Sequence, residues 1–207
     1  MTISIDKEII KDMPVVTYSG KIHLIDKPQQ VQSAIAVLRR SDIVGFDTES
    51  RPAFRKGVHN KIALLQLATE NEAFLFRLCK IGMPDELTAF LEDPSIQKVG
   101  LSTHDDFLQL HSLCNAMPQG FIELQKVVQE FHITDLGLQK IYAILFGERI
   151  NKSRQLSNWA AESLTPSQQN YAAIDAWACL RIYEHLRSGN FVPEESPYRH
   201  DEASSTD

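Results

Sequence analysis

The sequence predicts an α/β fold in which helices flank a mixed β-sheet. Short apolar runs, typical of strands covered on both faces, alternate along the chain with longer segments of helical periodicity. Two of these runs, 62–68 and 73–78, are separated by a short polar turn, which indicates a hairpin near the front of the chain. The 207 residues, of which 43% are hydrophobic, suffice for one domain with a substantial core.

The expected elements follow one another in a regular order. The strands are the apolar runs at 21–25, 43–46, 62–68, 73–78, 98–101 and 121–124. The helices have apolar residues at helical spacing and cover 26–40, 84–92, 104–113, a stretch after 124, 135–146 and 166–187. The last helix has the clearest start, because Thr165 is a typical N-cap and Pro166 occupies the first turn.

Composition divides the chain into three regions. Residues 1–20 show no strong pattern and are expected to be an N-terminal extension, whereas residues 21–188 form the main domain. Residues 189–207 are rich in Pro, Ser, Glu and Asp and are expected to be a disordered acidic tail. This tail carries −4 of the formal net charge of −6. The acidic balance argues against tight binding of a long nucleic acid, but not against an enzyme that grips a short strand end.

Simple features disfavour several classes of protein. No apolar run is long enough to span a bilayer, and the N-terminus lacks the basic-then-apolar layout of a secretory signal. The cysteines Cys79, Cys114 and Cys179 match no zinc-binding spacing and are expected to be reduced, buried thiols. We therefore expect a cytoplasmic protein that makes no membrane contact.

Two carboxylates follow the expected strand at 43–46. Asp47 and Glu49 are two residues apart, so in a continued strand their side chains point to the same face. Two such acids repel each other, and a hard divalent cation removes this cost while keeping water ligands for a substrate. A solvated strand end with chance acids explains the same spacing, and this short motif alone favours that interpretation.

A second pair of polar residues lies on the last expected helix. Tyr171 and Asp175 are four residues apart and therefore share a helix face. The helix is apolar nearly all round, which indicates burial, and a buried Asp needs a partner such as a cation. An exposed pair on an amphipathic helix is the alternative, but the apolar surroundings favour the functional interpretation.

A third acidic segment, HDD at 104–106, is uninformative alone, because acids often stabilise a helix N-terminus. The three segments together, IVGFDTES, KVGLSTHDDFLQL and YAAIDAWACLRIY, closely resemble the ordered motifs of the tyrosine-bearing branch (DEDDy) of the DEDD exonuclease superfamily. The resemblance spans about residues 40–188. The relatives most similar in these motifs are the Werner-syndrome-type exonuclease domain and ribonuclease D.

This resemblance implies a fold and a reaction. The fold is the RNase H-like exonuclease fold, with a mixed five-stranded sheet, one antiparallel strand and helices on both faces. The reaction is hydrolysis of phosphodiester bonds from the 3′ end of a nucleic acid, with release of nucleoside 5′-monophosphates. Two Mg²⁺ or Mn²⁺ ions per site are the implied cofactors, and no nucleotide cofactor is expected.

The resemblance also implies roles for four acids, with the aspartate of the second motif at Asp106 rather than Asp105. Asp47 would bridge both metal ions. Glu49 and Asp175 would hold the ion that carries the attacking water, and Asp106 would support the other ion through water. Four carboxylates suit this task, because two cations make hydroxide available at neutral pH and stabilise the attacking and leaving oxygens.

The fifth implied catalytic residue is Tyr171, which would orient the attacking water, since a free phenol with a pKa of about 10 is a weak base. Two departures from the family pattern touch none of the metal ligands. Ser102 stands where relatives often have Gly, and AAESL follows Trp159 where ribonuclease D-like sequences tend toward an Arg-Pro-Leu ending.

Residues that flank the motifs are candidate contacts with the nucleic acid: Arg51, Phe54, Arg55, Lys56, Phe107, Leu108, Lys152 and Arg154. The basic residues would contact phosphates, and Phe54 would stack on a base. Ordinary surface charge and core packing explain the same residues. Trp159 is expected to be structural, and Glu123 either supports a metal ligand or is a plain surface acid.

Several functions remain open. The favoured substrate is a single-stranded or 3′-recessed DNA end, and the alternative is trimming of RNA in the manner of ribonuclease D, which depends on tolerance of the terminal 2′-hydroxyl. A non-catalytic nucleic-acid-binding module is expected to lack one or more acids, and none is missing. A related endonuclease or integrase is disfavoured by the Y-x-x-x-D pattern. The sequence predicts no particular oligomeric state.

Overall fold

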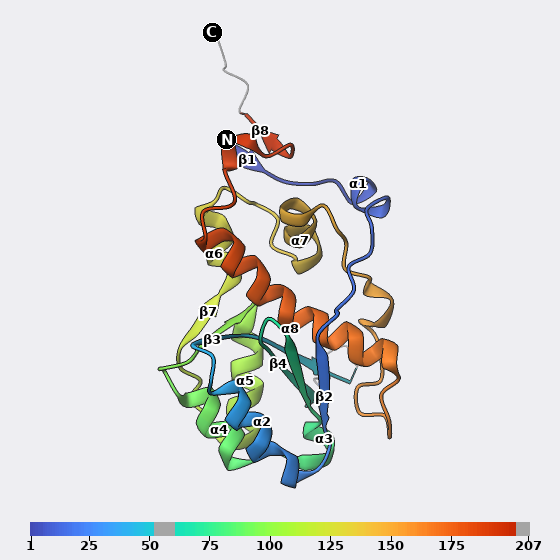
Figure 1. Ribbon diagram of the computed structural model, residues 1–207, viewed down its shortest axis with the longest axis vertical. Coiled ribbons are helices and arrows are strands. Elements are labelled where there is room, and N and C mark those ends of the chain that lie inside the picture. The colour runs from blue at the N-terminus through green and yellow to red at the C-terminus, as the bar shows by residue number, and fades with distance from the viewer. Residues whose placement is uncertain (52–60, 202–207) are drawn as a thin grey trace.

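The protein is built on a mixed sheet, and its computed structural model describes residues 1–51 and 61–201 (Figure 1). The sheet contains β2 (Lys21–Ile25), β3 (Ile43–Ser50), β4 (Ile62–Ala68), β5 (Glu72–Phe76), β6 (Gln97–Gly100) and β7 (Phe121–Glu123). Their spatial order is β2-β5-β4-β3-β6-β7. Strand β4 is antiparallel to β3 and β5, whereas the other neighbouring pairs are parallel.

Helices cover both faces of this sheet. Buried residues of α2 (Val31–Leu38), α4 (Asp85–Glu92) and α5 (Thr103–Cys114) form one core cluster with one face. Buried residues of α6 (Leu124–Glu130), α7 (Leu138–Phe146) and α8 (Pro166–Arg187) form a second cluster with the other face. The predicted α/β fold with helices on both faces is therefore confirmed.

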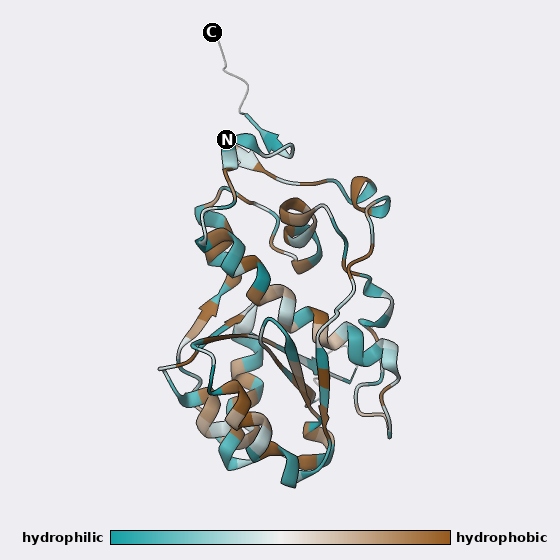
Figure 2. Cartoon of the chain, in the orientation of Figure 1, coloured by the Kyte–Doolittle hydropathy of each residue, from teal (hydrophilic) through white to brown (hydrophobic). Residues whose placement is uncertain are grey.

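Short elements complete the described chain: β1 (Thr2–Ile3), α1 (Lys7–Lys11), α3 (Leu78–Ile81), β8 (Arg199–His200), and the 3₁₀ helices η1 (Pro28–Gln30), η2 (Lys152–Arg154) and η3 (Pro193–Glu195). Figure 2 shows hydrophobic residues in the strands and in stripes along the helices, with hydrophilic residues on the outer turns. Within residues 1–51 and 61–201, no helix combines the length and apolar character needed to cross a membrane.

The sheet differs from the expectation in two ways. It has six strands rather than the five implied by the family resemblance, because β2 pairs with the free edge of β5. Strand β3 also continues to Ser50, four residues beyond the expected end at 46. The antiparallel ladder to β4 extends this strand, and it pairs Asp47 with Gln66 and Glu49 with Leu64. The two acids therefore lie inside a strand rather than after it.

Both ends of the chain are more structured than the sequence indicates. Residues 1–20, expected to be a patternless extension, contain β1 and α1 and bury Ile3 and Ile10 in the core cluster of α8. Residues 189–207 are expected to be disordered, but the 3₁₀ helix η3 (Pro193–Glu195) and the strand β8 (Arg199–His200) lie within this segment. Strand β8 pairs with β1, and composition cannot reveal such a partner almost 200 residues away in sequence.

The position of α8 depends on a close contact with β3. A Cβ atom at Gly45 would lie 1.9 Å from the carbonyl oxygen of Ala176, so any larger residue would push the helix away from the strand. The helix starts where the sequence predicts, because the Thr165 hydroxyl accepts from the backbone N–H of Gln168, whose side chain accepts from the backbone N–H of Thr165 in return. The N-cap thus determines where the helix begins, and Gly45 determines how closely the helix approaches the sheet.

We expect Gly45→Ala to lower the free energy of unfolding by about 1–3 kcal/mol, because the added methyl group overlaps the backbone of α8. Urea unfolding measures this change. Gly137→Ser is the control, since a Cβ there meets nothing within 4 Å and Ser is a favourable N-cap residue for α7, and it should change stability by less than about 0.5 kcal/mol. Equal stability of Gly45→Ala and wild type would contradict the proposed role of this contact.

Candidate active site

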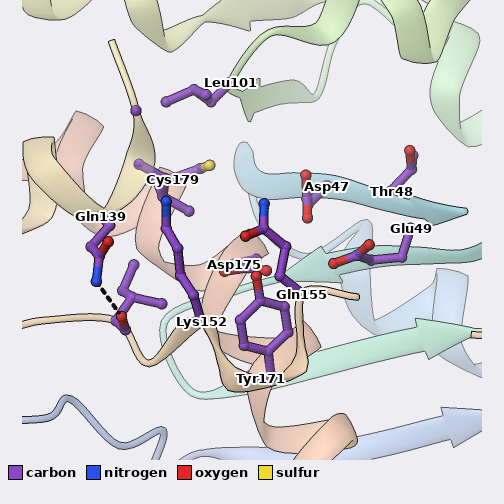
Figure 3. Close-up of a pocket in the computed structure, with 13 residues that line it drawn as sticks. Asp47, Thr48, Glu49, Leu101, Gln139, Lys152, Gln155, Tyr171, Asp175 and Cys179 are labelled. Carbon is purple, nitrogen blue, oxygen red and sulfur yellow. Dashed lines mark hydrogen bonds between the residues drawn. The ribbon is translucent and has the colours of Figure 1, made fainter. Parts of the chain in front are cut away.

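Three predicted carboxylates converge between β3 and α8. Asp47 and Glu49 project from the same face of β3, and Asp175 projects from α8 (Figure 3). Single carboxylate oxygens of the three residues lie within 4.8 Å of one another. Asp175 is only 6% exposed, whereas the other two acids are half-buried. The cluster is therefore open on one side and closed by the helix on the other.

These acids line a pocket of about 340 Å³. The other walls come from Tyr171, one turn before Asp175, and from Lys152 and Gln155 in and after η2. Cys179 lies one turn after Asp175 and also reaches the pocket (Figure 3). The expectation of buried thiols is correct for Cys179 but wrong for Cys79, which is exposed.

The charges of the three acids oppose one another. Burial, and then the negative charges of Asp175, Glu49 and Asp106, raise the pKa of Asp47 well above its ordinary value. Burial and the charges of Asp175 and Asp106 raise the pKa of Glu49 to about 9. Burial raises the pKa of Asp175 to about 7, although Tyr171 and Lys152 act in the opposite direction. Without a cation, the site thus holds protons at neutral pH.

The chemistry of this set fits a hard divalent cation. Carboxylate oxygens are the preferred ligands of Mg²⁺, and a cation would supply the positive charge that the cluster lacks. Asp47, Glu49 and Asp175 are the residues that could hold it directly.

Asp106 lies apart from these three acids. It belongs to α5, on the opposite side of the sheet from α8, and it accepts a hydrogen bond from the hydroxyl of Thr48. Alternation along β3 turns Thr48 away from Asp47 and Glu49, toward α5. Burial raises the pKa of Asp106 to about 6, against the effect of the Thr48 hydrogen bond. The family motifs assign no role to Thr48, although the alternation of side chains along β3 indicates that it faces away from Asp47 and Glu49.

Glu123 fixes the start of α5. Its carboxylate accepts hydrogen bonds from the backbone N–H groups of Ser102 and Thr103, both at 2.9 Å, and from the Thr103 hydroxyl. It also accepts from the backbone N–H of Gln125 as the N-cap of α6. Ser102 has φ +60°, the left-handed region that favours glycine, so Glu123 stabilises an unfavourable backbone conformation. Two roles are expected for Glu123, support of a metal ligand or a plain surface acid. The geometry agrees with the first, because Glu123 fixes the start of the helix that carries Asp106.

Trp159 is more than a core residue. It is fully buried, and its ring stacks on that of Tyr171 with centroids 6.0 Å apart. Its indole N–H falls short of a hydrogen bond, yet it lies close enough to Glu49 to lower the pKa of that acid. The hydroxyl of Tyr171 points toward Asp175 (Figure 3). Burial and the neighbouring acids raise the pKa of Tyr171, so it stays protonated.

The expected substrate contacts separate into different environments. Lys152 lines the pocket, and Arg154 donates from Nε to the Ser167 hydroxyl at 3.1 Å. Phe107 is half-buried, packs edge-on against Phe121 with ring centroids 4.7 Å apart, and lines the same hollow as Leu108.

The remaining contacts are more exposed or lie outside the described chain. Leu108 is 60% exposed and lines a separate hollow, and Arg51 is exposed at the end of β3. Phe54, Arg55 and Lys56 lie outside the described residues.

The chain is similar to known proteins in both sequence and fold. The sequence profile of the 3′-5′ exonuclease family matches residues 22–189. Over 155 residues the chain is 32% identical to the bifunctional 3′-5′ exonuclease/ATP-dependent helicase WRN of Mus musculus, a match that covers 72% of this chain and 11% of that protein. The chain thus spans about a tenth of the length of this relative.

Solved structures show the same fold. The Nibbler EXO domain of Aedes aegypti superimposes with a TM-score of 0.76 at 22% identity, covering 87% of this chain and 97% of that one. Escherichia coli RNase D gives a TM-score of 0.73 at 24% identity, covering 81% and 44% respectively. These likenesses confirm the RNase H-like exonuclease fold.

The chain therefore belongs to the 3′-5′ exonuclease family, whose members are hydrolases that act on phosphodiester bonds and depend on divalent metal ions. The predicted family is therefore confirmed.

The pKa shifts predict how the metal-free protein responds to pH. An acid whose pKa is higher in the folded than in the unfolded state stabilises the fold at low pH and loses this effect as pH rises. The pKa is about 9 for Glu49 and about 7 for Asp175 in the folded protein, whereas unfolded carboxyl groups have pKa values near 4. The melting temperature in EDTA should therefore fall as the pH rises from about 5 to about 9. Saturating Mg²⁺ should reduce this fall, because the cation takes the place of the protons.

Asp175→Asn removes one of the three opposing charges. In EDTA at pH 8 the variant should melt at a higher temperature than wild type, and Mg²⁺ should no longer stabilise it. Differential scanning fluorimetry across pH, with and without Mg²⁺, measures both effects. The electrostatic account fails if the variant keeps the wild-type dependence on pH and on metal.

Proposed function

We propose that this chain is a DEDDy-type 3′→5′ exonuclease that removes nucleoside 5′-monophosphates from the 3′ end of a nucleic acid, with two Mg²⁺ or Mn²⁺ ions in the site. The observation that carries the proposal is the convergence of Asp47, Glu49 and Asp175 within 4.8 Å in a pocket that Tyr171 also lines. The negative charges of these acids repel one another, and a bound cation would offset this repulsion. We assign the activity to a domain of residues 21–188.

Each acid has a distinct role in this proposal. Asp47 would be a ligand shared by the two ions, and Glu49 and Asp175 would help to hold the ion that carries the attacking water. Asp106 would support the second ion through water, because its carboxylate accepts a hydrogen bond from Thr48 and lies outside the cluster of three. The ions, when bound, make hydroxide available at neutral pH and stabilise the attacking and leaving oxygens.

Tyr171 positions the attacking water rather than removing its proton. Its hydroxyl points toward Asp175, and its raised pKa keeps the proton in place at physiological pH. A protonated phenol can hold a water molecule by donating or accepting a hydrogen bond, but it is no general base. Lys152, at the rim of the same pocket, contacts a phosphate of the substrate.

DNA is the first candidate substrate. RNA is the second candidate, because the similar structure of Escherichia coli RNase D is described as that of an exoribonuclease involved in structured RNA processing. Matched DNA and RNA oligonucleotides of one sequence separate the two by their kcat/KM values. We propose that the protein acts in the cytoplasm on single-stranded or 3′-recessed ends.

Wild-type protein should shorten 5′-labelled oligonucleotides from the 3′ end in Mg²⁺ or Mn²⁺ and not in EDTA. Asp47→Asn should reduce the rate by about 100-fold or more, because it removes the acid that contacts both ions. Tyr171→Phe should lower kcat with little change in KM, because it affects only the attacking water. Denaturing gels with time points resolve these ladders.

The two neighbouring acids of α5 provide a matched control. Asp106→Asn should lose most of the activity, whereas Asp105→Asn, which changes an exposed acid, should retain it. Failure of the pure wild-type protein to degrade any of the DNA or RNA substrates would refute the proposed function.

A further inference from the structure

Gln66 is a fully buried polar residue that no part of the described structure satisfies. It lies in the middle of β4, is 0% exposed, and neither its Nε2 nor its Oε1 has a hydrogen-bond partner. Among residues 1–51 and 61–201, it is the only side chain with two such atoms. A buried amide without partners costs free energy, and an apolar residue of the same size would avoid that cost.

The register of the sheet places this amide beside the active site. Gln66 is the cross-strand partner of Asp47 in the antiparallel ladder between β3 and β4. Directly opposed residues in such a ladder share a face, with Cβ atoms about 4.5–5.5 Å apart. Asp47 points toward α8, so the Gln66 side chain points toward α8 as well.

The packing of β4 supports this orientation. Leu64 and Ala68, two residues before and after Gln66, belong to the core cluster that contains Ala172 and Ala176 of α8. The intervening Leu65 and Leu67 belong to the cluster on the other face. On the β5 side, the partner of Gln66 is Leu75, which is apolar. The carboxylate of Asp47 is therefore the cross-strand polar group that the amide can serve.

We infer that Gln66 is a positioning residue for Asp47, and that its amide N–H is donated to the Asp47 carboxylate when cations occupy the site. This inference rests on the proposed function. A carboxylate that contacts two ions must be held in one orientation, and hydrogen bonds from outside the ligand set provide this constraint.

Gln66→Met tests the inference, because methionine keeps the length of the side chain and removes both polar atoms. Isothermal titration calorimetry should show Mn²⁺ binding weakened by roughly tenfold or more. The melting temperature in EDTA should stay the same or rise, since an unsatisfied amide is removed. Turnover should fall, with little change in KM for an oligonucleotide.

A packing control and a second variant keep the test decisive. Leu75→Met introduces the same side chain at the neighbouring position of β5 and should leave Mn²⁺ binding unchanged. If Gln66→Met does not fold, Gln66→Asn replaces it, because its amide is one methylene too short to reach and should weaken binding similarly. Wild-type affinity for Mn²⁺ in a folded Gln66 variant would overturn the inference.

Nuclear magnetic resonance of the wild-type protein gives a direct readout. Addition of Mg²⁺ should shift the side-chain amide signals of Gln66 downfield, as a new hydrogen bond forms. If the backbone signal of Asp47 moves and the Gln66 signals do not, the ion binds without this residue, and only the inference fails. If neither moves and Mn²⁺ does not bind, the proposed function fails with it.

Discussion

The close contact between β3 and α8 is the constraint on which the site depends. Gly45 has no side chain, and the carbonyl of Ala176 occupies the space that a Cβ would fill. Asp175 directly precedes Ala176 in the chain, and Asp47 follows Gly45 by two residues. The same contact that packs the helix on the sheet therefore determines how closely carboxylates from two elements approach each other.

That approach is unfavourable for the protein alone. Burial and mutual repulsion raise the pKa values of Asp47, Glu49 and Asp175, so the fold holds protons where a cation would bind. Other parts of the structure compensate by fixing the surroundings. Glu123 caps α5, which carries Asp106, and the α8 helix is anchored by its capping box. The stability of the core thus maintains a site that is electrostatically strained.

Many elements could be predicted because their signals are local. The Thr165 cap, the apolar runs of β4 and β6, and the shared helix face of Tyr171 and Asp175 depend only on neighbours in sequence. The extension of β3 through Ser50 could not be predicted in this way, since it depends on pairing with β4. The same holds for β8, whose partner is at the other end of the chain.

The sequence by itself determined the α/β class, because periodicity reports which face each residue occupies. The resemblance of its three motifs to the exonuclease family identified the acids. Only the tertiary structure decided which acids meet. It brought together Asp47, Glu49 and Asp175, held Asp106 apart through Thr48, and placed Trp159 against Tyr171 and Gln66 beside Asp47. These contacts join separate elements, so they depend on strand register and helix distance, which no local pattern specifies.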